Sequence, residues 1–275
     1  MHASRAERSA SRLPLEFDVF ANCSGGFGVR MRSIRLDVVP ATSPVQPHEV
    51  ASGPEANRIR AIIESGLARD RTALESLAEV MRAGNEELRY WAADALGKIG
   101  DPRAIPALVG ALGDEYSAVR MSACVALGDL KARDAVAPLI RVVTGKVPSG
   151  KGYRLFIPEE VGEVRWMAAR ALGKIGDATA VDPLIEVLGS ADGDLGLYVA
   201  QALGDLRDSR AVPALMEKAR RRNEPELRGI VEALGRVGDP RARSILLELL
   251  ETGKEDVRHA AAIALERMKG SPQSR

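Results

Sequence analysis

The best candidate for phosphate chemistry in this 275-residue chain is the stretch ALGKIGD, which has a lysine between two glycines. It occurs twice, at Ala95–Asp101 and Ala171–Asp177. A Walker loop needs a longer glycine span that ends in Lys-Ser or Lys-Thr, between a strand and a helix. Here Lys98 is followed by Ile99, and no strand is predicted before it. The motif therefore indicates a repeated structural unit and not a phosphate site.

The other reactive side chains form no catalytic arrangement. Two cysteines, Cys23 and Cys124, are too few for a disulfide framework or a cysteine zinc site, and they fit a reducing cytoplasm. Cys23 has no basic neighbour in sequence that would favour its thiolate, and no Ser/His/Asp arrangement is apparent. We predict a protein that is not an enzyme, with no catalytic, cofactor-binding or metal-binding residues.

Composition argues against several classes of partner. The chain carries 39 basic and 38 acidic residues and only 4% aromatic residues, so neither bulk charge nor base stacking favours nucleic acid. One basic run, Lys218 with Arg220–Arg222, could contact phosphates or form the solvated C-terminus of a helix. No apolar run approaches the ~20 residues of a membrane span, and the N-terminus lacks the apolar centre of a secretory signal. We expect a cytoplasmic protein without a membrane or nucleic-acid partner.

An internal repeat accounts for the duplicated motif. Its leucine recurs in register, at intervals of 31 residues and one interval of 45, which is one period with a 14-residue insertion. The six positions are Leu96, Leu127, Leu172, Leu203, Leu234 and Leu265. The copy that contains Leu234 aligns with one residue deleted from its first helix, and residues 57–84 form a degenerate first copy.

Each copy predicts two short helices. In the copy around Leu96, apolar residues recur at helical spacing before Gly100, which suits the left-handed end of a helix. Asp101 is a helix-capping residue and Pro102 suits a first helical position. One such pair cannot bury its apolar faces alone, so the copies must stack into a solenoid.

The copies resemble the HEAT-like repeat of the phycobilisome (PBS) lyase type, which reads roughly Val-Arg-x-x-Ala-Ala-x-Ala-Leu-Gly-x-Ile-Gly-Asp. The resemblance covers about residues 57–269 and implies an all-α fold, an armadillo-like α-α superhelix of about six helix pairs plus a terminal helix. Members of that family are mostly adaptors, and some relatives help to attach bilins to phycobiliproteins. The resemblance therefore implies a non-catalytic protein-interaction scaffold, with an accessory role in protein modification as the alternative.

One relative in that family, deoxyhypusine hydroxylase, is a di-iron enzyme whose ligands are His-Glu pairs carried in several repeats. This chain has three histidines, and only His48 is followed by a glutamate, outside the repeats. His259 is followed by Ala260. The converging ligands of an iron site are therefore missing from the pattern, and we expect no metal.

Residues 1–56 differ from the repeats in composition. They predict either a β-hairpin followed by a linker or a disordered segment, ahead of the solenoid at 57–275. The 14-residue insertion predicts a loop at 145–160, rich in glycine and proline. Its apolar side chains could bind a partner or pack on their own repeat.

Partner binding is expected where the copies disagree, because shared positions build the core. The first candidate is the insertion. The second is a column of large apolar residues on the side of the first helices that faces away from the core, and it also contains Met121 and Leu197. These residues would form a stripe on the convex side of the solenoid or pack between neighbouring first helices. The third is a polar column along the second helices, which the resemblance places on the concave face. The candidate residues are Tyr153, Phe156, Trp166, Tyr90, Arg141, Glu186, Arg210, Glu217 and Arg241.

Overall fold

A computed structural model describes residues 54–146, 158–191, 193–221 and 224–269, all within one compact unit that spans residues 49–275. The predicted N-terminal hairpin or disordered segment and most of the predicted loop lie outside the described residues. The described part contains helices and 3-10 turns, without strands. The boundary between residues 56 and 57 stays a prediction.

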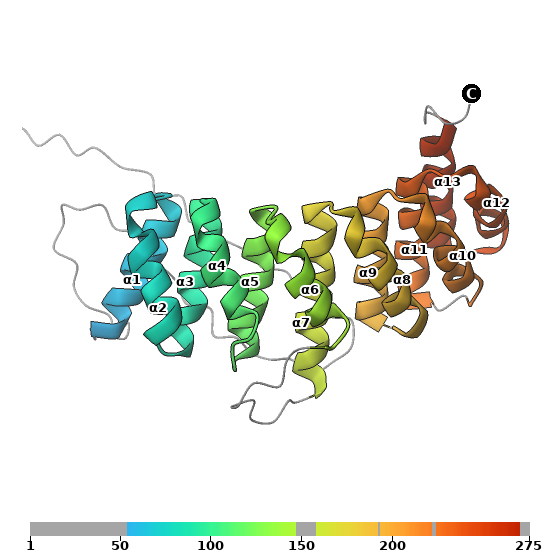
Figure 1. Cartoon of the computed structure of the whole chain (residues 1–275). Coiled ribbons are helices and arrows are strands. Elements are labelled where there is room, and N and C mark those ends of the chain that lie inside the picture. Colours follow the sequence, from blue (N-terminus) through green and yellow to red (C-terminus); the bar gives the residue numbers. More distant parts are fainter. Residues whose placement is uncertain (1–53, 147–157, 192, 222–223, 270–275) are drawn as a thin grey trace, which may run out of the picture. The chain divides into compact units, whose positions relative to one another are not determined.

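The described helices pair in chain order and stack side by side, with α13 closing the series (Figure 1). The first helices of the pairs are α1 (Pro54–Leu67), α3 (Glu86–Ile99), α5 (Ser117–Asp129), α7 (Pro158–Ile175), α9 (Gly193–Leu206) and α11 (Glu224–Val237), followed by α13 (Glu255–Lys269). The second helices are α2 (Leu74–Ala83), α4 (Ile105–Ala111), α6 (Val136–Val143), α8 (Val181–Ser190), α10 (Val212–Arg220) and α12 (Arg243–Thr252). Six pairs and a terminal helix confirm the predicted all-α solenoid.

The predicted helix end and cap are confirmed, with one refinement. Gly100 adopts φ 74°, and its N–H donates to Leu96 O, which ends α3. The Asp101 carboxylate then accepts from the N–H of Arg103. This bond caps a 3-10 turn, Pro102–Ala104, that precedes α4, so the aspartate starts the second helix through an intervening turn.

The capping aspartates make the fold sensitive to acid. The side chain and backbone N–H of Arg103 both donate to Asp101, which lowers the pKa of this carboxyl from 3.8 to about 2. The pKa of Asp70, Asp177, Asp208 and Asp239 is lowered by the same kind of hydrogen bonds. A carboxyl with a lowered folded pKa stabilises the fold above its unfolded pKa, and this contribution is lost as pH falls toward the folded pKa.

We therefore expect the melting temperature to fall steeply between pH 4 and pH 2, as measured by circular dichroism. The Asp101→Asn variant keeps an acceptor for the turn but does not titrate. It should melt lower than wild type at pH 7 and lose less on acidification. Equal losses in both proteins would contradict this account.

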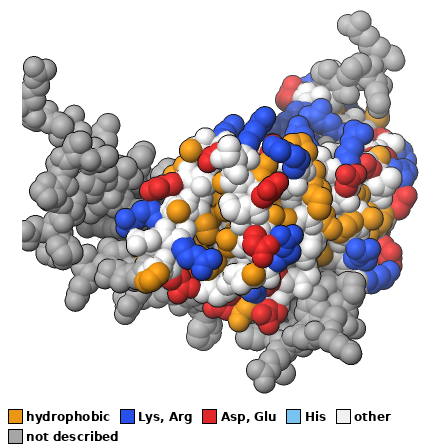
Figure 2. Space-filling model, turned by 60° about the vertical axis from the view of Figure 1, so that its left-hand side comes forward, with side chains coloured by type: hydrophobic (Ala, Val, Ile, Leu, Met, Phe, Trp, Pro, Cys, Tyr) orange, Lys and Arg blue, Asp and Glu red, His pale blue; other side chains and the backbone are white. Residues whose placement is uncertain are grey.

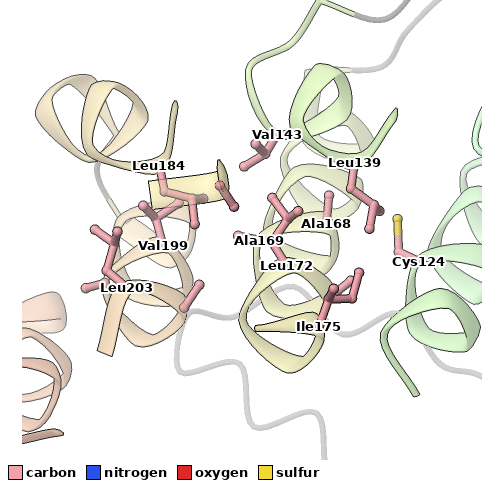
Figure 3. Packing of buried hydrophobic residues seen from close by; sticks show 14 of the residues in the cluster. Cys124, Leu139, Val143, Ala168, Ala169, Leu172, Ile175, Leu184, Val199 and Leu203 are labelled. Carbon is pink, nitrogen blue, oxygen red and sulfur yellow. The ribbon is translucent and has the colours of Figure 1, made fainter. Parts of the chain in front are cut away.

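The core lies between the two layers of helices. The recurring leucine is fully buried in five copies, Leu265 in the last copy is 8% exposed, and one apolar cluster runs through the whole array. Figure 3 shows Leu172 of α7 between Cys124 and Leu139 on one side and Leu184 and Leu203 on the other. Each inner repeat thus buries its apolar stripe against both neighbours.

The glycine of the repeat motif brings first helices into backbone contact. A Cβ on Gly97 of α3 would lie 3.0 Å from the Cα of Ala126 on α5, a distance that real Cβ atoms rarely reach. Gly128, Gly173, Gly204 and Gly235 meet an alanine of the next first helix in the same way. Neighbouring second helices contact one another much less. This contact confirms the packing interpretation of ALGKIGD.

Candidate partner-binding surface

The apolar column on the first helices lies on the surface of the array. Tyr90 on α3 is 37% exposed, and Met121, Trp166 and Leu197 on the next three first helices are half-buried. The rings of Tyr90 and Trp91 meet edge to face, with centroids 5.1 Å apart. Four successive repeats therefore carry large apolar side chains that are partly open to solvent.

Trp166 does not stand alone in this column. Its ring stacks on Tyr198 of α9, with centroids 4.4 Å apart and planes 14° from parallel. The sequence column omitted Tyr198, because this residue follows Leu197 and occupies the next position on the helix. Trp91 and Met167 occupy that same neighbouring position and are also half-buried. Examining the adjacent position in each copy would have revealed a wider apolar surface.

We define this surface as the aromatic stripe: Tyr90, Trp91, Met121, Trp166, Met167, Leu197 and Tyr198. The stacked pair links two repeats at its middle. Aromatic pairs of this geometry contribute beyond the area they bury, and aromatic side chains dominate protein interfaces. The stripe can therefore bind an apolar part of a partner.

The charged candidates on the second helices differ in their exposure and in the contacts that they make within the chain. Arg141 on α6 and Glu186 on α8 are exposed. Glu217 on α10 is exposed as well, 3.5 Å from Arg220 in an ion pair along the helix. Figure 2 shows cationic and anionic side chains interspersed with apolar ones over the face in view. Such a mixed surface carries no single sign of charge.

Arg210 and Arg241 connect neighbouring repeats. Arg210 donates to Asp182 at 2.7 Å and to the carbonyl oxygen of Ala178 in the preceding turn at 3.1 Å. Arg241 repeats the second contact, donating to Ser209 O at 2.9 Å. Both guanidinium groups also bind the capping aspartate of their own turn. Both side chains are thus engaged within the array.

Tyr153 and Phe156 lie outside the described residues. The described chain resumes at Pro158 with α7, which carries Trp166. Their role in binding stays a prediction that rests on this closeness in sequence.

The basic run is only partly a solvated helix end. Arg220 and Arg221 are exposed, as that interpretation predicts, but Lys218 is 3% exposed. Its ammonium lies 3.3 Å from a carboxylate oxygen of Glu226, which is fully buried. The solvated interpretation is therefore wrong for Lys218, because the lysine points into the boundary between two repeats.

The deletion inferred in this copy is also wrong. Helix α11 is continuous. In every other copy an apolar residue stands eight residues before the repeat leucine, and Glu226 occupies this position before Leu234. Those residues are Leu88, Val119, Val164, Leu195 and Val257. Lys218 likewise replaces Ala111, Val142, Val187 and Leu249 of the other second helices. Two buried apolar positions have become an ion pair.

A third departure from the pattern completes this cluster. The repeat arginine donates to backbone carbonyls near the end of the preceding repeat, as Arg120 does to Glu115 O at 2.9 Å. Gly196 replaces that arginine in α9, and Lys218 donates instead to the equivalent carbonyl, of Ala191. A Cβ on Gly196 would lie 2.6 Å from a carboxylate oxygen of Glu226. The three exchanges fit one another in space.

The repeats also match a known family in sequence. A family model of HEAT repeats matches residues 49–128, 74–149, 159–230 and 219–275. The chain belongs to the HEAT-repeat family. No curated protein matches the chain.

Several solved structures are similar to this chain. The CpcE–CpcF complex of phycocyanin lyase from Nostoc sp. PCC7120 is 23% identical, with 86% of this chain and 98% of that chain covered and a TM-score of 0.45. Human deoxyhypusine hydroxylase is 21% identical, over 78% and 97%, with a TM-score of 0.36. An archaeal HEAT-like repeats protein from Thermococcus onnurineus NA1 is 16% identical, over 83% and 99%, with a TM-score of 0.51. Of the three, only the archaeal protein has a TM-score above 0.5, and at 16% identity it supports the fold alone.

Reactive groups in the described HEAT repeats are few. Burial raises the pKa of the Cys124 thiol to about 12, which disfavours the thiolate that nucleophilic or metal chemistry needs. His259 is exposed on α13, and His48 lies outside the described residues. Among the residues placed by the structure, no three His, Cys, Asp or Glu side chains gather as metal ligands would. None of the described helices is long and apolar enough to cross a bilayer.

Proposed function

We propose that this HEAT-repeat chain is a non-catalytic protein-interaction scaffold that binds its partner along the aromatic stripe. The observation that carries the proposal is the stacked pair of Trp166 and Tyr198, half-buried at the boundary of two repeats. Partly exposed apolar side chains are aligned over four repeats, whereas exposed apolar residues on a protein surface are normally scattered singly. A partner that buries the stripe would remove this surface from water.

The spacing of the helices favours the aromatic stripe, and not the surface of the second helices, as the binding site. First helices approach to backbone contact, whereas second helices are less closely packed. A stack with one tighter layer bends toward that layer, so we infer that the stripe lies on the inner side of the array. The resemblance had placed the second helices there. Arg210 and Arg241 are engaged within the chain, which leaves Arg141, Glu186 and Glu217 as polar contacts of a second, weaker candidate surface.

Tyr153 and Phe156 belong to the proposal as an extension of the stripe. The insertion leads directly into α7, and the chain has few other aromatic residues. Aromatic residues are the commonest anchors at the centres of interfaces.

Truncating Trp166 tests the proposed site. A photo-reactive amino acid at position 121 would first capture the partner from native lysate, for identification by mass spectrometry. Binding of the purified partner would then be measured by biolayer interferometry. Because a central interface tryptophan contributes ~2–4 kcal/mol, Trp166→Ala should weaken binding about 30-fold or more.

The matched control is Arg141→Ala, an exposed change on α6 that should alter binding less than about threefold. The double change Tyr153→Ala with Phe156→Ala should weaken binding without lowering the melting temperature if the insertion contacts the partner. Loss of binding on Arg141→Glu, with Trp166→Ala unaffected, would move the site to the second helices. No captured partner at all would count against a scaffold.

A further inference from the structure

The last repeat leaves its stacking face open. Leu250 on α12 and Ala262 on α13 are only half-buried, although the corresponding residues of earlier repeats are buried beneath the repeat that follows. For Leu250 these are Leu112, Val143, Leu188 and Ala219, and for Ala262 they are Ala93, Cys124, Ala169, Ala200 and Val231. The last described repeat thus has an apolar face that is open to solvent. In every earlier repeat, a helix of the next repeat covers the equivalent face.

This face forms a groove of about 520 Å³ between α12 and α13. Leu247 is 43% exposed and Ile263 is 40% exposed, and both line the groove beside Leu250 and Ala262. Exposing large aliphatic side chains side by side is costly in water. The groove therefore favours an apolar occupant.

The rim of the groove is predominantly cationic. Arg243, Arg267 and Lys269 line it together with one carboxylate, Glu266. That carboxylate pairs with Lys269 at 2.5 Å. Within the described residues, no carboxylate lies within ion-pair distance of Arg243 or Arg267. An acidic occupant would supply the missing counter-charges.

Glu266 also excludes another repeat of the usual kind. It occupies the position of the glycine through which each first helix touches the next, as Gly235 of α11 touches the backbone of α13. There a Cβ would already lie 2.7 Å from the Cα of Ala264. A complete glutamate side chain keeps a further first helix from approaching in this way. The occupant must therefore be seated differently, over Leu247 and Ile263.

We propose that this groove binds a single amphipathic helix of a partner protein, with an apolar face toward α12 and α13 and acidic residues along its flanks. A helix covers the equivalent face of every earlier repeat, and an i, i+3, i+7 apolar pattern fits a groove between two helices. Residues 270–275, Gly-Ser-Pro-Gln-Ser-Arg, offer neither large apolar side chains nor acidic ones. This surface is independent of the aromatic stripe.

The test uses the full chain and two fluorescent 16-residue helical peptides. Both carry leucines at i, i+3 and i+7, and their flanks carry glutamates in one and lysines in the other. Fluorescence anisotropy should show at least tenfold tighter binding of the glutamate peptide. Leu247→Glu should weaken its binding tenfold or more, and Arg243→Glu with Arg267→Glu should reverse the preference between the peptides. Arg170→Glu, an exposed change on α7, is the control and should have no effect.

Four results would overturn the proposal. Equal binding of both peptides, or binding unaffected by Leu247→Glu, would show that the groove is not the site. A dimer in light scattering that Leu247→Glu dissociates would identify a second copy of the chain as the occupant. If the glutamate peptide binds only after Leu15 and Phe17 are changed to serine, the occupant of the groove is the chain's own N-terminal segment.

Discussion

Replacing Lys218 by alanine is expected to lower the free energy of unfolding by about 3–5 kcal/mol, measured by urea denaturation with circular dichroism. The ammonium of Lys218 lies 3.3 Å from Glu226, and both side chains are buried at the boundary between two repeats. Without the lysine, a carboxylate remains in a site that is closed to water. The cost comes from that uncompensated charge and not from a lost attraction alone.

A double variant separates these two explanations. Lys218→Val with Glu226→Leu restores the residue types that the other repeats carry at both positions. Well-packed apolar replacements of a buried ion pair are often neutral or stabilising. The double variant should therefore be more stable than either single variant and close to wild type. A double variant as unstable as the single variants would show that the cost comes from losing the attraction between the two charges, and additive losses would show that the two side chains do not act as a pair.

Leu172→Ala should cost about 2–5 kcal/mol, because it removes a fully buried leucine from the middle of the array. The side chain packs against both neighbouring repeats, as Figure 3 shows. In a stacked array each repeat contacts only its neighbours, so the damage should stay local. Hydrogen exchange should show α6 to α9 losing protection before α1 and α13.

The control for Leu172→Ala is Arg170→Ala, an exposed change in the same helix. It should alter the free energy of unfolding by less than about 0.5 kcal/mol. Unchanged melting of Leu172→Ala, with protection uniform along the chain, would remove Leu172 from the core.

Periodicity in the sequence was sufficient to predict the architecture. Three features specify the helix ends and the buried stripe: a leucine every 31 residues, a glycine four residues later and a capping aspartate. In the copy around Leu96 the structure confirms the roles of the leucine, the glycine and the aspartate. These features are local, so they can be recognised within a single copy, although Lys131 and Arg207 replace the glycine in two copies. The outward column that contains Tyr90 and Trp166 was predictable for the same reason, since helical spacing alone assigns the face.

Only the tertiary structure could decide what the exceptions to the repeat do. Gly196, Lys218 and Glu226 are far apart in sequence. Taken singly, Gly196 suggests only a missing arginine, Lys218 a solvated cation, and the copy that contains Glu226 a deletion. Packing brings them together because a solenoid places equivalent positions of successive repeats side by side. The stacking of Tyr198 on Trp166 depends on the same contact between repeats. A pattern within one copy assigns each residue to a face, but which side chain it meets depends on how closely the next repeat packs.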